Sequence, residues 1–185
     1  MPFRPRKPVA LLDEDALFDY GVRLLGQQMR TVAEVRRLLH RRVEPDEAGE
    51  ARLNAVLTRL KERKYLNDAS YAEDYTKLRQ ENASFGRRRV QQDLMRKGVQ
   101  ATVIGKTLDA AYENIDEEEL ARRHLERKRI PKPKNEKEAA RVMRMLMRAG
   151  FSSPTIFRIL KKWNVDEAAL SAIESAEPEE NTGDA

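Results

Sequence analysis

The sequence contains no cysteine, a single tryptophan and no long hydrophobic run. Without cysteine, the chain forms no disulfide, offers no thiolate to a metal and has no thiol nucleophile, which fits a reducing compartment. No stretch approaches the roughly 20 apolar residues that a membrane-spanning helix needs. The basic, proline-containing start, MPFRPRKPVALL, lacks the apolar segment of a signal peptide. We therefore expect a soluble, cytoplasmic protein.

Glycine and proline are also scarce, with eight of each in 185 residues. Long stretches consist of Ala, Leu, Arg, Lys, Glu and Gln, which favour helices. Hydrophobic residues make up 40% of the chain and charged residues 36%, so enough apolar side chains exist to form a core. No segment shows the alternation of apolar and polar residues that is typical of a strand. These features predict an all-α protein.

The motifs of common catalytic sites are absent as well. The sequence has no G-x-G-x-x-G, G-x-x-x-x-G-K-[ST] or G-x-S-x-G pattern. His40 and His124 are far apart, and neither has a second histidine at H-x-x-x-H spacing. The acidic run 117–119 is expected in the first turn of a helix, where the helix dipole stabilises negative charge. We expect no enzymatic activity, no cofactor and no metal site.

The net charge of +5 is unevenly distributed along the chain. Residues 120–148 carry 11 Lys and Arg against three Glu, whereas residues 166–185 carry seven acidic residues and no basic one. Two interpretations stay open: a solvated helical face followed by a solubilising tail, or a surface for a polyanion or an acidic partner. Under the second, one hypothesis is that the tail competes with DNA for the basic segment.

Three segments of the chain resemble one another: RLLHRRV (37–43), DLMRKGV (93–99) and MLMRAGF (145–151). Gly98 and Gly150 precede the closing apolar residue, which indicates helix ends, because glycine readily adopts the left-handed conformation found there. Arg42 occupies this position in the first segment, so that helix must end differently. Apolar stripes at helical spacing follow each segment, and one further helix is predicted before each, at residues 14–27, 68–81 and 117–129.

The similar segments recur every 52 to 56 residues, which predicts three tandem three-helix repeats. We place them at residues 12–66, 67–115 and 116–165, between a basic N-terminal arm (1–11) and an acidic tail (166–185). Because one such repeat buries too little surface to be stable alone, neighbouring repeats should stack into an elongated, curved array that binds along a face. Helix starts are predicted at a capping box, Thr31-Val-Ala-Glu34, and at Asp116, Asn135 and Ser153-Pro154.

The stretch GRRRVQQDLMRK is the clearest candidate for binding. Val90 and Leu94 are four residues apart and should face the core together, so Arg87 and Arg88 project elsewhere. Arginine suits bidentate contacts with phosphate or carboxylate groups. Tyr71, four residues before Tyr75, could stack on bases, but this spacing is more typical of a core stripe, and we expect both tyrosines in the interior.

YLNDASYAEDY (65–75), followed by SFGRRRVQQDLMRKGV (84–99), resembles the central signature of the RecX family. The resemblance is specific in this stretch and looser over residues 12–165. Two positions depart from the family pattern, since Arg87 stands where a proline is common and Asn67 replaces a common Asp. The matching residues are Tyr65, Leu66, Asn67, Asp68, Tyr71, Ala72, Glu73, Tyr75, Gly86, Arg89, Val90, Gln92, Leu94, Lys97, Gly98 and Val99.

The resemblance implies a non-catalytic regulator of the recombinase RecA. Such proteins lie in the groove of the RecA–single-stranded DNA filament, restrain filament growth, ATP hydrolysis and strand exchange, and bind DNA weakly. We expect this chain to act on that filament as a monomer, with single-stranded DNA as a secondary contact and no membrane partner. Two alternatives remain: a helical protein that binds DNA without a recombinase, and a helical scaffold with no polyanion partner.

The expected contact residues are basic side chains of the second and third repeats. Gly86 and Arg89 are expected to have structural roles within the motif. The candidates are Arg87, Arg88, Lys97, Arg122, Arg123, Arg127, Lys128, Arg141 and Arg144.

Overall fold

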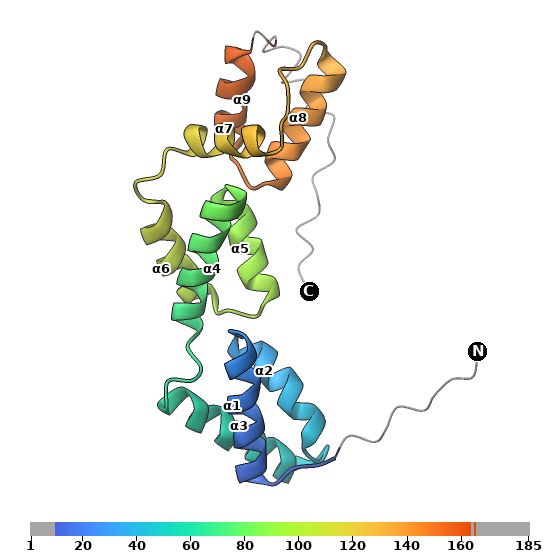
Figure 1. The fold of residues 1–185 in the computed structure, drawn as a ribbon, viewed down its shortest axis with the longest axis vertical. Helices are drawn as coiled ribbons and strands as arrows, with labels where there is room; N and C mark the ends of the chain where they lie inside the picture. The colour runs from blue at the N-terminus through green and yellow to red at the C-terminus, as the bar shows by residue number, and fades with distance from the viewer. Residues whose placement is uncertain (1–9, 164, 166–185) are drawn as a thin grey trace, which may run out of the picture. The chain divides into compact units, whose positions relative to one another are not determined.

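The computed structural model describes residues 10–163 and residue 165, and these residues form helices and no strand (Figure 1). The all-α repeat array predicted from the sequence is therefore confirmed. The acidic tail and most of the N-terminal arm lie outside the described residues. Among the described helices, none has the length and apolarity to cross a membrane. The helices are α1 (Glu14–Gln27), α2 (Val32–Leu39), a 3-10 helix η1 (His40–Arg42), α3 (Glu47–Glu62), α4 (Asp68–Ala83), α5 (Arg87–Arg96), α6 (Ala101–Tyr112), α7 (Glu117–Arg127), α8 (Glu136–Arg148) and α9 (Ser153–Lys162).

Four helices, α2, α7, α8 and α9, begin where the sequence predicts a helix start. The Thr31 hydroxyl accepts the Glu34 backbone N–H at 3.1 Å, and the Glu34 carboxylate accepts the Thr31 N–H at 3.2 Å, which completes the capping box. The side chains of Asp116 and Asn135 likewise accept backbone N–H groups in the first turns of α7 and α8. Pro154 lies in the first turn of α9, where a missing N–H costs nothing.

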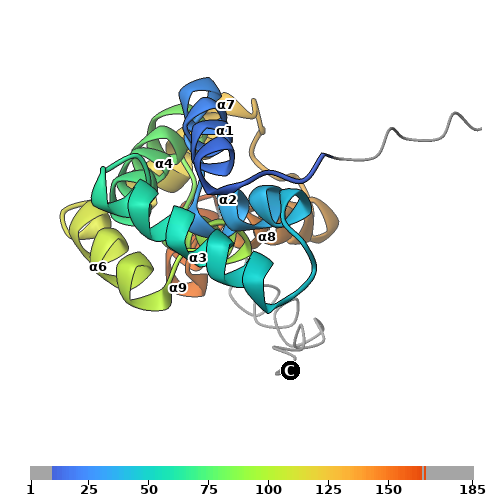
Figure 2. The same ribbon diagram turned by 90° about the horizontal axis from the view of Figure 1, so that it is seen from below.

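The described parts of residues 1–75 and 93–107 form one compact unit. Its core lies where α1 packs against α2 and α3 (Figures 1 and 2). The apolar stripe predicted for α3 points into this core, which explains why these helices pack through one face each. The buried residues are Leu17, Phe18, Val35, Leu39, Val43, Leu53, Val56, Leu57, Leu60 and Leu66.

The described parts of residues 76–92 and 108–185 form a second compact unit. Here α7 and α8 both pack against α9, and Phe85 and Tyr112 pack against their shared core. The central triplet α4–α6 thus contributes residues to both units. The larger buried side chains of this core are Leu120, Leu125, Met143, Leu146, Phe151, Ile156, Ile159 and Leu160.

The three similar segments end their helices in two ways. Gly98 and Gly150 have φ angles of 77° and 89°, so both adopt the left-handed conformation that the sequence predicts. α2 instead ends through the 3-10 helix η1, and the Arg42 carbonyl accepts the Leu12 backbone N–H at 2.8 Å. This hydrogen bond gives the carbonyl at the end of the first segment a partner, although no glycine is present there.

Candidate contact surface

In the first unit, the end of α5 meets the start of α2. The Thr31 hydroxyl donates to the Lys97 carbonyl at 2.7 Å, and the Val32 N–H donates to the Asp68 carboxylate at 2.9 Å. A Cβ atom at position 98 would lie 2.4 Å from the Ala33 Cβ. Gly98 is therefore required by close approach as well as by its φ angle.

The side chain of Lys97 also contributes to this contact between the end of α5 and the start of α2, and we call such a contact between a helix end and a helix start a joint. Its Nζ lies 3.1 Å from a Glu34 carboxylate oxygen and 5.6 Å from the ring centroids of Tyr71 and Tyr75, which stack on each other. The interaction with Tyr71, helped by Glu34, raises the pKa of Lys97 even though partial burial opposes this. Tyr71 is buried and Tyr75 half-buried, so the two tyrosines are interior residues, as expected.

In the second unit, the end of α8 meets the start of α5 in a similar way. The Gly86 N–H donates to the Ala149 carbonyl at 2.8 Å, and the Arg88 N–H donates to the Gly150 carbonyl at 3.3 Å. A Cβ atom at Gly150 would lie 2.2 Å from the Arg89 backbone nitrogen. The free N–H groups of one helix start are thus satisfied by the free carbonyls of another helix end, and their opposite partial charges attract.

The end of α4 is held by two side chains of α7. Arg127 donates to the Glu81 carbonyl at 3.0 Å and also to the Asn82 carbonyl, while His124 Nδ1 lies 2.8 Å from the Ala83 carbonyl. The buried imidazole contacts the rings of Phe85 and Phe151. Burial lowers the pKa of His124, and nearby Lys128 and Arg127 lower it further. His124 is a structural residue, as expected.

The predicted arginines of α5 and α7 are partly neutralised within the second unit. Arg87 pairs with Asp109 at 2.6 Å, and Arg123 pairs with Glu119 at 3.2 Å. Arg122 pairs with Glu118, whose carboxylate is shared with Lys162 at 2.5 Å. Lys162 and then Arg122 lower the pKa of Glu118. This face of α7 is therefore an ion-pair network that extends to α9.

Glu117 joins the start of α9 to α7. Its carboxylate accepts the Ser152 N–H at 2.8 Å, the Ser152 hydroxyl at 2.5 Å and the Thr155 hydroxyl at 2.6 Å. Burial alone would raise the pKa of Glu117, but these hydrogen bonds and the nearby Arg88 hold it below its usual value. The acidic run 117–119 thus has structural roles in the first turn of α7.

The remaining predicted residues are exposed. Arg88, Lys128 and Arg141 make no ion pair with any described residue, and Arg144 lies on the exposed face of α8 with Arg141. Lys137 and Arg148 share that face but are not among the predicted contact residues. Their helical spacing with Arg141 and Arg144 is nevertheless evident from the sequence. Of the predicted residues, Lys97 lies in the first unit and the other eight lie in the second. The described residues hold no cluster of His, Asp or Glu able to bind a metal ion.

Comparisons with known proteins agree with this arrangement. Residues 67–108 match the family model "RecX, second three-helix domain", and residues 116–160 match "RecX, third three-helix domain". The chain is 33% identical over 146 residues to the regulatory protein RecX of Mycolicibacterium vanbaalenii, covering 75% of this chain and 77% of that protein. It is 34% identical over 161 residues to its Deinococcus radiodurans counterpart, covering 86% and 74%.

The fold is also similar to a solved structure. The crystal structure of RecX from Lactobacillus salivarius superposes with a TM-score of 0.65 at 20% sequence identity, covering 82% of this chain and 97% of that one. The sequence identity, the two domain matches and the shared fold agree, and the chain therefore belongs to the RecX family of regulatory proteins.

Proposed function

We propose that this chain is a non-catalytic regulator that binds the RecA–single-stranded DNA filament and restrains its growth, ATP hydrolysis and strand exchange. The proposal is supported by the position of residues from the RecX-like signature at contacts between helices of different triplets. Lys97 and Gly98 form the joint between α5 and α2, and Gly86 forms the joint between α5 and α8. The signature thus specifies how the repeats are joined, which suits a protein that binds along an extended partner rather than in a catalytic pocket.

Eight of the nine predicted basic residues fall into three groups within this proposal, and the ninth, Arg144, lies on the exposed face of α8. Lys97 and Arg127 hold joints between helices of different triplets, so they would act by shaping the binding surface. Arg88, Lys128 and Arg141 are exposed and make no ion pair with described residues, so they can contact a partner without breaking an internal bond. Arg87, Arg122 and Arg123 are intermediate, since each would exchange an internal carboxylate for one on the partner.

Binding to preformed RecA filaments tests this proposal. Arg87→Gln combined with Arg88→Gln should weaken co-sedimentation with filaments on single-stranded DNA by about tenfold or more, because both guanidinium groups are lost from the proposed face. Glutamine is preferable to glutamate, because an acid at these positions would face Asp109 and Glu117 and disturb the second unit.

Arg37→Gln with Arg41→Gln is the matched control. It removes the same charge from two exposed arginines near the end of α2 and should leave filament binding unchanged. If the α5 variant keeps its helical circular dichroism and binds filaments as tightly as the wild type, the α5 face takes no part in binding. Failure of the wild type to sediment with filaments would contradict the proposal as a whole.

A second candidate function is direct DNA binding without a recombinase. The charge of residues 120–148 favours direct DNA binding, since this segment contains 11 basic residues and only three acidic ones. In that case the chain should affect RecA only at amounts that coat the DNA, and its effect should weaken steeply as salt rises.

A further inference from the structure

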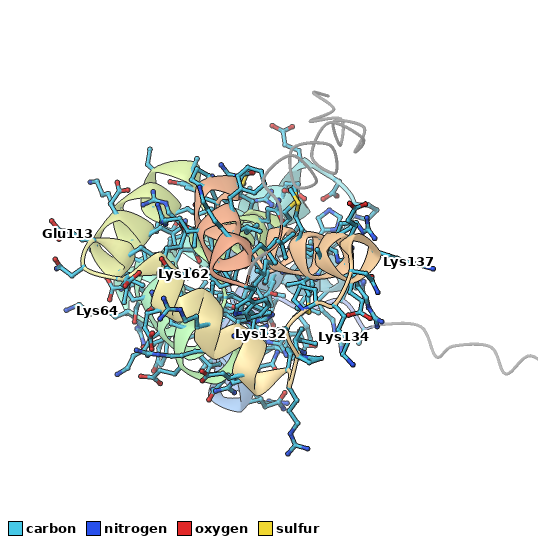
Figure 3. All side chains as sticks on the ribbon, turned by 90° about the horizontal axis from the view of Figure 1, so that it is seen from above. Lys64, Glu113, Lys132, Lys134, Lys137 and Lys162 are labelled. Carbon is cyan, nitrogen blue, oxygen red and sulfur yellow. The ribbon has the colours of Figure 1, made fainter. Side chains whose placement is uncertain are left out.

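The exposed face of α8 carries an uninterrupted row of basic side chains, which we call the α8 stripe: Lys137, Arg141, Arg144 and Arg148. Steps of four, three and four residues place them on one side of the helix. The opposite side is buried in the core of the second unit through Ala139, Val142, Met143 and Leu146, so the stripe points to solvent. Lys137 projects from the start of α8 (Figure 3).

The other two triplets provide an internal comparison, since α2 and α5 occupy the places equivalent to α8. With 43, 99 and 151 aligned, the equivalent positions in the second triplet hold Phe85, Arg89, Gln92 and Arg96. Those in the first triplet hold Met29, Ala33, Arg36 and His40. Polar residues at the ends of these rows have acidic partners, since Arg36 and His40 both contact Glu50, and Arg96 pairs with Asp93. The fold therefore does not require a basic row here.

The α8 stripe is also less neutralised than the basic face of α7. Three of its four residues, Lys137, Arg141 and Arg148, make no ion pair with described residues, whereas Arg144 does interact with another group. Glu138 lies in the same turn as Lys137 and Arg141, but its carboxylate accepts the Lys134 backbone N–H at 2.8 Å and so helps to begin the helix. On α7, by contrast, Arg122 and Arg123 are paired with Glu118 and Glu119.

We propose that the α8 stripe is a binding site for the phosphate backbone of a single nucleic-acid strand. The eleven residue steps from Lys137 to Arg148 extend over about 16 Å of helix, a length that can face several phosphates of one strand. Three of the four residues are arginines, which bind phosphate bidentately. The row contains no aromatic or apolar anchor of the kind that protein interfaces bury, so a linear polyanion fits it better than an acidic protein. The inference rests on the proposed function, in which the filament supplies such a strand.

The test is fluorescence anisotropy of a labelled oligo-dT strand at several KCl concentrations, with no recombinase present. The stripe variant combines Lys137→Gln, Arg141→Gln, Arg144→Gln and Arg148→Gln. Losing four phosphate contacts should reduce the slope of log affinity against log salt by about 3, and affinity near 0.1 M salt by at least about tenfold. A second variant, Arg141→Lys with Arg144→Lys and Arg148→Lys, keeps the charge and should keep the slope.

The matched control removes four exposed charges from the first unit: Arg23→Gln, Arg37→Gln, Arg41→Gln and Lys61→Gln. The slope of log affinity against log salt should stay within about 1 of the wild-type value. This result would show that DNA binding depends on the α8 stripe and not on net charge alone. The inference is overturned if the stripe variant keeps the wild-type slope, or if the control loses as much as the stripe variant. It is also overturned if the stripe variant binds DNA normally but no longer binds filaments, because the stripe would then contact protein.

Failure of the proposed function would look different. If the wild-type chain does not sediment with RecA filaments, the proposed function fails. The anisotropy result stands independently, because no recombinase is present in that experiment.

Discussion

His124 is buried between the end of α4 and the core around Phe151. Its Nδ1 lies 2.8 Å from the Ala83 carbonyl, which can only accept, so Nδ1 carries a proton and the neutral ring donates this hydrogen bond. The positive charges nearby, Lys128 and Arg127, disfavour a second proton. The residue therefore contributes to stability as a neutral group, and this contribution depends on pH.

The pH dependence has a defined sign. Because the pKa of His124 is lower in the folded chain, the unfolded chain takes up a proton first as pH falls below about 6.5. The stabilising contribution is present above that pH and is lost as pH falls toward the lower folded-state pKa. The wild-type free energy of unfolding, measured with urea, should therefore drop between pH 7.5 and pH 5.5 by more than that of His124→Asn, which keeps a donor but cannot titrate.

His40→Asn serves as the control for this experiment. His40 is exposed and lies 3.0 Å from Glu50 on the surface of the first unit, so its replacement should keep most of the wild-type loss of stability. If His124→Asn loses as much stability as the wild type over this interval, the buried imidazole is not the group responsible.

Two joints between helix ends and helix starts link helices of different triplets. Gly98 brings the end of α5 onto Ala33 of α2, and Gly150 brings the end of α8 onto Arg89 of α5. In both joints, carbonyls at a helix end accept hydrogen bonds from groups at a helix start. Each glycine therefore ends a helix in the left-handed conformation and also allows the close contact with the next helix. These two requirements account for the glycine in two of the three similar segments.

Alanine at either glycine should be costly. Gly150→Ala would place a Cβ atom 2.2 Å from the Arg89 nitrogen in a backbone conformation with φ near 89°. The left-handed conformation alone costs about 1–2 kcal/mol for a residue with a side chain, and the contact adds to this. We expect Gly98→Ala and Gly150→Ala each to lower the free energy of unfolding in urea by about 2 kcal/mol or more.

Gly105→Ala is the matched control, since position 105 lies inside α6 and the added Cβ would have no atom within 4 Å apart from its chain neighbours and the backbone of its own helix. It should leave stability unchanged or raise it by up to about 1 kcal/mol, because alanine favours helices more than glycine does. Equal stability of Gly150→Ala and Gly105→Ala would contradict the role given to the joints.

Local pattern explains how much of these elements can be predicted from the sequence. The capping box at Thr31 and the glycines after α5 and α8 involve residues within a few positions of each other, so their roles follow from spacing alone. The partner of Arg87 is Asp109, 22 residues away, and Arg127 meets carbonyls about 45 residues away. Such pairs depend on how helices pack, and no local pattern specifies them.

The α8 stripe can be predicted only in part, because its spacing is local but the pairing of nearby arginines depends on how the helices pack. Arg141 and Arg144 are among the contact residues predicted from the sequence and Lys137 and Arg148 are not, although all four share one helical spacing. The comparison with α2 and α5 is also available from the aligned segments. What the sequence does not reveal is that Arg122 and Arg123, which contribute equally to the positive charge of residues 120–148, are occupied by Glu118 and Glu119.

For the whole molecule, the repeats differ in what they offer a partner. The described part of the first unit pairs several of its basic residues internally, as Arg36 does with Glu50 and Arg59 with Asp15. The second unit presents both the ion-pair network of α7 and the α8 stripe. A chain built in this way can combine a protein contact with a nucleic-acid contact on different helices.

The most direct test of this account is the rate of RecA's ATP hydrolysis on single-stranded DNA as increasing amounts of this chain are added. A regulator that acts on the filament should lower the rate at amounts far below those needed to coat the DNA. We predict such an inhibition at substoichiometric levels, retained by the Arg37→Gln, Arg41→Gln control. A rate that stays constant until the DNA is coated would contradict the account and favour competition for the strand.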